Sequence, residues 1–106
     1  MKYFYQGFIP VLLMILIASC AGTIPEPAQE QIQWASAKWP GTGKKELSEG
    51  RELYILKCSG CHSLRQPDSR SENEWRQIMP KMGKKAKLTD SEYEMILRYL
   101  SALSGR

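Results

Sequence analysis

The chain has 106 residues, 42% of them apolar, which is enough for one small domain and a targeting segment. Its formal net charge of +4 is a mild excess of basic residues and does not by itself indicate a nucleic-acid-binding protein. The sequence shows no internal repeat and no sustained alternation of polar and apolar residues, so a repeat protein is excluded and a sheet is not expected.

The N-terminus has the pattern of a bacterial export signal. One basic residue, Lys2, precedes an apolar run from Phe8 to Ala18, which has the length of a signal-peptide core and is shorter than the roughly 20 residues of a membrane-spanning helix. The stretch "LIASCAG" that follows resembles the lipobox of bacterial lipoproteins. The resemblance implies cleavage after residues 1–19 and lipidation of Cys20, with an uncleaved anchor as the alternative.

Both interpretations place the rest of the chain outside the cytoplasm. Lipoproteins that stay in the inner membrane of enteric bacteria carry an aspartate after the lipidated cysteine, and this chain has Ala21 there. The resemblance therefore favours the outer membrane, facing the periplasm, with the inner membrane as the alternative.

Residues 20–45 are expected to form the lipidated cysteine and a tether, because the composition shifts to Pro, Gln, Gly, Thr and Lys with few core-forming side chains. Trp34 and Trp39 depart from this composition. They fit either a segment packed on the following domain, or its beginning, or two partly exposed rings.

Residues 46–106 predict an all-α domain of three or more helices. In "ELSEGRELYILKC", Leu47, Gly50, Tyr54 and Cys58 recur at steps of three and four, which places them on one helix face. Glycine inside a helix costs about 1 kcal/mol relative to alanine. A close approach by another backbone would explain Gly50.

Two further helices are indicated by capping boxes. Ser71 and Glu74 open the first, which Pro80 is expected to end or kink. Thr89 and Glu92 open the second. The second then carries an apolar stripe and a glycine stop at Tyr93, Ile96, Leu97, Leu100, Leu103 and Gly105.

The stretch "KCSGCHSL" contains Cys58, Cys61 and His62. A structural zinc site needs four ligands, whereas the chain has three cysteines and one histidine, with Cys20 assigned to lipid. A thioredoxin-like dithiol belongs with a strand that this sequence does not predict, and a plain disulfide leaves His62 unexplained.

C-x-x-C-H is the signature of c-type haem attachment. Cys58 and Cys61, about one helical turn apart, can form thioethers with one haem edge, and the imidazole of His62 can then bind the iron. One covalent haem c would also supply the apolar core that a domain of about 60 residues lacks.

The sixth iron ligand is left open by this motif. His62 is the only histidine, so a second imidazole from this chain is excluded, and the position falls to Met, Lys, another weak donor, water or nothing. Met79 and Met82 flank Pro80, where the chain is expected to turn, whereas Met95 lies in the third helix and fits core filler.

Over residues 46–104 the chain resembles the small bacterial members of the class I cytochromes c. The resemblance rests on "EGRELYILKCSGCH", on "MILRYL" and on "EWRQIMPKMGKKAKLTD". It implies that the first and last helices cross with Gly50 at their contact. It also implies that Met82 is the axial methionine, with Met79 as the alternative, and matches Pro67 to the proline that orients the proximal imidazole.

A His62/Met82 pair fills both axial positions, so the expected function is one-electron transfer and not catalysis at the iron; a thioether ligand also raises the reduction potential. The alternative function is a ligand-responsive haem module in which a small molecule such as CO or NO displaces the methionine. A third possibility is a haem that only stabilises a tethered interaction domain.

Several polar residues are expected near this haem. Three side chains are candidate hydrogen-bond partners of its propionates: Arg65, Arg70 and Trp75. The alternative is that both arginines are exposed to solvent and that Trp75 packs in the core or against the haem. A set of lysines surrounds Met82 and fits either docking to an acidic redox partner or an ordinary solvated loop. These lysines are Lys81, Lys84, Lys85 and Lys87.

Overall fold

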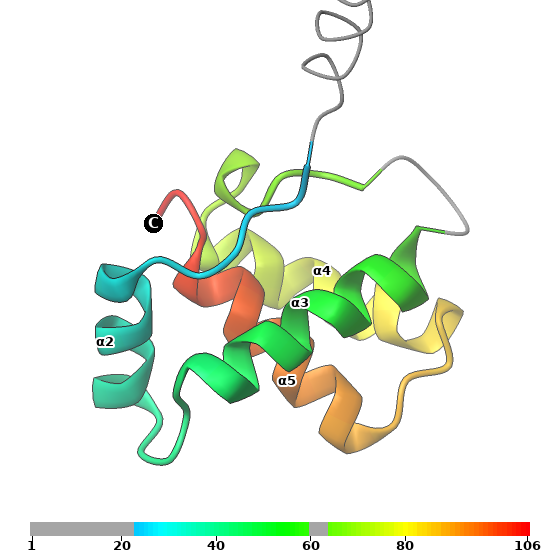
Figure 1. The fold of residues 1–106 in the computed structure, drawn as a ribbon. Coiled ribbons are helices and arrows are strands. Elements are labelled where there is room, and N and C mark those ends of the chain that lie inside the picture. The colour runs from blue at the N-terminus through cyan, green and yellow to red at the C-terminus, as the bar shows by residue number, and fades with distance from the viewer. Residues whose placement is uncertain (1–22, 60–63) are drawn as a thin grey trace, which may run out of the picture.

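The computed structural model describes residues 23–59 and 64–106 and, over these ranges, contains helices and no strand. In chain order the elements are α2 (Gln29–Lys38), α3 (Lys44–Cys58), the short 3-10 helix η1 (Pro67–Ser69), α4 (Glu72–Lys85) and α5 (Asp90–Ala102) (Figure 1). The expected all-α class is confirmed.

Helix α5 is the centre of the fold. It packs against α3, α4, α2 and η1, whereas α3 and α4 make at most slight contact with each other. The predicted stripe on α5 supplies much of the core, since Ile96, Leu97, Leu100 and Leu103 are all buried. Tyr99, on the same helix, is also fully buried.

Gly50 lies where α3 crosses α5. A Cβ atom at this position would lie 2.9 Å from Cβ of Tyr99 and would overlap the carbonyl oxygen of Met95. The prediction that another backbone approaches this glycine is therefore confirmed, and the approach is what fixes the spacing of the two helices.

Both predicted capping boxes are present. The Ser71 hydroxyl accepts a hydrogen bond from the backbone N–H of Glu74 (3.1 Å), and the Glu74 carboxylate accepts one from the N–H of Ser71 (3.0 Å). Thr89 and Glu92 form the same pair of bonds. The backbone N–H bonds hold the pKa of both carboxyl groups below the usual value.

Of the two outcomes expected at Pro80, a helix end or a kink, the end is wrong, and so is the helix end expected at Gly105. Helix α4 runs through Pro80 to Lys85; the proline is exposed, so water can reach the Arg76 carbonyl that it leaves without an N–H partner. Helix α5 ends at Ala102, before Gly105. Gly105 instead packs against the end of η1, where its N–H donates to the Arg70 carbonyl (2.9 Å).

The expected tether over residues 20–45 does not hold for residues 24–43. Ala35 on α2 is fully buried, and Trp34 and Trp39 are half-buried and pack against the core with their rings in edge contact at 5.6 Å. The two tryptophans thus lie in a segment packed on the domain, which is one of the alternatives that the sequence left open for them.

No helix in residues 23–59 and 64–106 is both long and apolar enough to cross a membrane.

Candidate functional site

Of the residues expected to hold a haem, Cys58 and Met82 lie in the described ranges. Cys58 is the last residue of α3; it is half-buried and packs against the core. Cys61 and His62 lie in residues 60–63 and Cys20 lies in residues 1–22, which are outside the described residues. The structure therefore describes the chain on either side of the motif, up to Ser59 and from Leu64 onward.

The chain on both sides of residues 60–63 is fixed to the core. Before them, Cys58 ends a helix that is packed on α5. After them, the Tyr54 hydroxyl donates a hydrogen bond to the Arg65 carbonyl (2.7 Å), and Nε1 of Trp75 donates to the Pro67 carbonyl (2.8 Å). The end before the motif is thus held by the packing of α3, and the end after it by the buried side chains of Tyr54 and Trp75.

These two bonds were not foreseen. Tyr54 was expected only on the inner face of the first helix, and Trp75 was expected in the core, where its 1% exposure confirms it. Burial raises the pKa of Tyr54 to about 12, so its hydroxyl keeps the proton that it donates. Pro67 is buried, and its carbonyl accepts from Trp75.

Met82 lies on α4, in its last turn, and not in a loop as its position after Pro80 had suggested. Its side chain is half-buried, whereas Met79, one turn earlier, is 2% exposed and belongs to the core. Met79 is therefore part of the core, whereas the side chain of Met82 is only partly covered by the described residues.

The ends of α3 and α4 meet the same end of α5. Lys57, beside Cys58, forms an ion pair with Glu92 in the first turn of α5 (3.6 Å). Gly83, beside Met82, lies under the ring of Tyr93, which a Cβ atom would approach to 2.9 Å. Cys58 and Met82 are therefore brought toward one end of the molecule.

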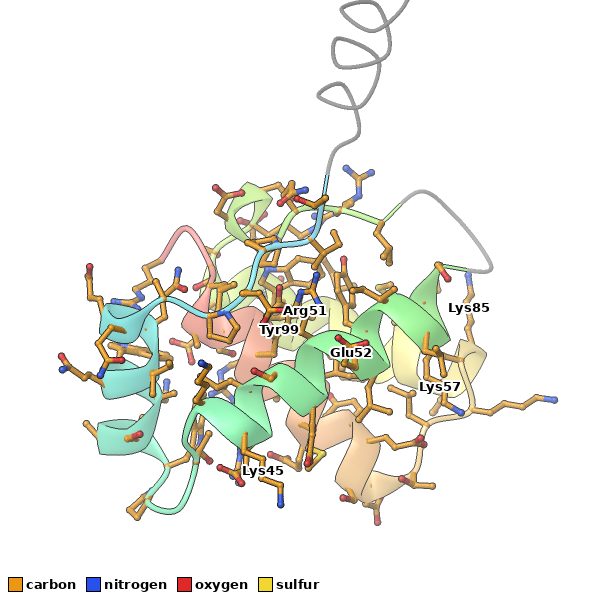
Figure 2. All side chains as sticks on the ribbon, in the orientation of Figure 1. Lys45, Arg51, Glu52, Lys57, Lys85 and Tyr99 are labelled. Carbon is orange, nitrogen blue, oxygen red and sulfur yellow. The ribbon has the colours of Figure 1, made fainter. Side chains whose placement is uncertain are left out.

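Basic side chains surround this end. Lys81, Lys84, Lys85 and Lys87 are all exposed. Figure 2 shows Lys57 near the end of α3 and Lys85 near the end of α4, on the same side of the molecule as the end of α3. The surface next to Met82 is thus positively charged.

Two observations bear on whether these residues fit a haem. Nε of Arg70 is buried and has no hydrogen-bond partner among the described residues, and its guanidinium lies 5.8 Å from the ring of Trp75. Leu56, two residues before Cys58, is 74% exposed and is the one large apolar side chain that the described ranges leave in solvent. An unused buried donor and an uncovered apolar side chain near the motif both fit an apolar group that carries carboxylates.

Comparison with protein-family models, with curated proteins and with solved structures finds no match for this chain.

Proposed function

We propose that the protein is an extracytoplasmic, lipid-anchored c-type cytochrome that carries one electron on a single covalent haem. The observation that carries the proposal is the C-x-x-C-H motif beginning at Cys58, the last residue of a helix packed on the core. In this proposal Cys58 and Cys61 attach the haem, His62 and Met82 bind its iron, and Cys20 carries the lipid.

The surroundings of the motif support this assignment. A bound haem has to keep one position relative to the domain, and the chain that flanks the motif is fixed: α3 holds it before the motif, and the bonds of Tyr54 and Trp75 hold it after. Arg70, whose buried Nε has no hydrogen-bond partner among the described residues, would supply guanidinium donors to a propionate. Helices α3 and α4, which carry Cys58 and Met82, both pack on α5 and make at most slight contact with each other, so α5 sets their relative positions.

The haem would supply a one-electron couple at its iron. Met82 would contribute a thioether, which favours the reduced state, and with His62 it would leave no axial position for a substrate. On this proposal the protein is not an enzyme. The exposed lysines beside Met82 would steer an acidic redox partner by charge, an attraction that salt weakens.

Substitution of the two methionines tests the proposal. We expect Met82→Ala to remove the weak sulphur-to-iron band of the oxidised protein, to lower the potential and to admit CO. Met79→Ala is the matched control: it should keep the band and lose about 2–5 kcal/mol of stability, because Met79 is a core residue. If only Met79→Ala loses the band, the sixth ligand is Met79 and not Met82, and the proposed electron transfer is unaffected.

The wild type also separates electron transfer from the ligand-responsive alternative. A carrier with both axial positions filled should resist CO in its reduced state. Rapid, stoichiometric CO binding by the wild type would replace electron transfer with ligand sensing as the proposed function.

Attachment itself is tested with Cys58→Ala combined with Cys61→Ala. The wild type should retain haem mass and absorbance after denaturation, and the double variant should lose both. Retention of covalent haem by the variant would refute the thioether assignment.

A further inference from the structure

The segment that precedes α2 is bound to the domain. In the N-terminal strap, defined here as Thr23–Pro27, the Ile24 carbonyl accepts a hydrogen bond from Nε of Arg51 (2.9 Å). The Pro25 carbonyl accepts one from the Tyr99 hydroxyl (2.6 Å). Figure 1 shows the strap passing over the C-terminal end of α5 on its way to α2, and Figure 2 shows Arg51 and Tyr99 below it in the same view.

Two more contacts extend this attachment in both directions. Nε2 of Gln66 donates to the Thr23 carbonyl (3.0 Å), and Nη1 of Arg51 pairs with the Glu26 carboxylate (3.1 Å). Helix α2 then follows with Ala35 fully buried. From Thr23 onward the chain belongs to the folded domain, so it adds no length to a tether.

We propose that the lipid on Cys20 holds this domain directly on the bilayer surface, with the side that carries Thr23 and Gln66 facing the headgroups. The inference rests on the lipid anchor of the proposed function. Three residue steps separate Cys20 from Thr23, a reach of about 10 Å for extended chain, whereas a tether continuing to Lys45 would reach about 85 Å.

The chemistry of that side suits phospholipid headgroups. Arg65, Gln66 and Ser69 are exposed there and can donate hydrogen bonds to phosphate and ester oxygens; Asp68, also exposed there, is an acceptor only. The connection between α2 and α3 lies at the opposite end of the domain from the start of the strap (Figure 1).

Neutron reflectometry of the full-length, haem-loaded lipoprotein on a supported phospholipid bilayer measures the water gap between headgroups and protein. We expect a gap of no more than about 10 Å for the wild type. Twenty Gly/Ser residues inserted between Gly22 and Thr23 should widen it to about 25 Å, the mean span of such a flexible linker. The same insertion after Gly41, in the exposed turn between α2 and α3, is the matched control and should leave the wild-type gap unchanged.

A wild-type gap as wide as that of the Gly22 insertion would overturn this inference, as would a widened gap in the Gly41 control. Mass spectrometry of Cys20 in the same samples separates the two levels of failure. A lipidated Cys20 with a wide gap overturns the inference and leaves the lipid anchor standing. An unmodified Cys20 thiol overturns the anchor and the inference together, and the haem assignment is judged independently from absorbance.

Discussion

Replacement of Gly50 by alanine is the sharpest test of how α3 and α5 are held together. On an open helix face the change would stabilise the protein by about 1 kcal/mol. Here the new Cβ atom overlaps the Met95 carbonyl and approaches Cβ of Tyr99 to 2.9 Å. Because most of the opposing atoms belong to backbone, a rotamer change cannot relieve the contact, and overpacking of this kind costs about 1–3 kcal/mol or more. The backbone overlap puts the cost at the upper end of this range, about 3 kcal/mol, so after the gain of about 1 kcal/mol we expect a net loss of about 2 kcal/mol.

Urea denaturation of the haem-loaded protein, followed by far-ultraviolet circular dichroism, measures this loss, and a fall of about 10 °C in Tm should accompany it. Gly83→Ala is the matched control. Its Cβ atom would meet the ring of Tyr93, a side chain that can move, so the loss should be smaller. A Gly50→Ala protein as stable as the wild type, or more stable, would refute the close crossing of α3 and α5.

Three further changes test the contacts around the site. Because burial raises the pKa of Tyr54 from 10.0 to about 12, its neutral phenol stabilises the fold below pH 10, and this contribution is lost as the pH rises toward 12. Tyr54→Phe should therefore make the unfolding free energy fall less steeply over that range, and identical slopes would contradict the burial. Trp75→Phe removes the donor to the buried Pro67 carbonyl and should cost at least about 1–3 kcal/mol in urea denaturation; an unchanged midpoint would show that the bond contributes nothing. Ala35→Asp buries a charge without a partner and should lower Tm strongly, whereas Ala37→Asp on the exposed face of α2 should cost less than about 1 kcal/mol; equal effects would mean that α2 is not packed.

The sequence predicts those parts of the fold that depend on neighbours along the chain. The Ser71 and Thr89 capping boxes need residues only three positions apart, and the stripe on α5 needs only helical spacing, so both are present as expected. Gly50 was predictable for a related reason, since a costly residue in a helix implies something that requires it.

The expectations that are wrong depend on which side of an element meets the core. Pro80 breaks a helix only if the carbonyl that it leaves unpaired cannot be satisfied, and here the proline faces solvent. Residues 20–45 contain few large apolar side chains, a composition that predicts a tether. The attachment of the described part comes from Ala35, from Trp34 and Trp39, and from backbone carbonyls that accept bonds from the side chains of α3 and α5.

The candidate site also combines features that depend on neighbours along the chain with features that depend on contacts between distant residues. The spacing of Cys58, Cys61 and His62 carries the haem prediction without any structure, because the chemistry depends on that spacing alone. The bond from the Tyr54 hydroxyl to the Arg65 carbonyl joins residues on either side of the motif, and no local sequence pattern predicts it. The sequence does not distinguish the exposure of Met82 from that of Met79, and the place of Met82 on a helix depends on the continuation of α4 past Pro80.

Glu92 links the folding of α5 to the placement of the proposed site. As the N3 residue of its capping box, it receives a backbone bond from Thr89 that starts the helix, and it also pairs with Lys57, which adjoins Cys58. The Thr89 bond, with Lys57 adding to it, holds the pKa of Glu92 below its usual value, so the carboxylate keeps its charge into the acidic range. The same residue that fixes where α5 begins therefore ties the end of α3 to it. An electron carrier requires that constancy, because its metal ligands have to keep their spacing while the charge at the iron changes.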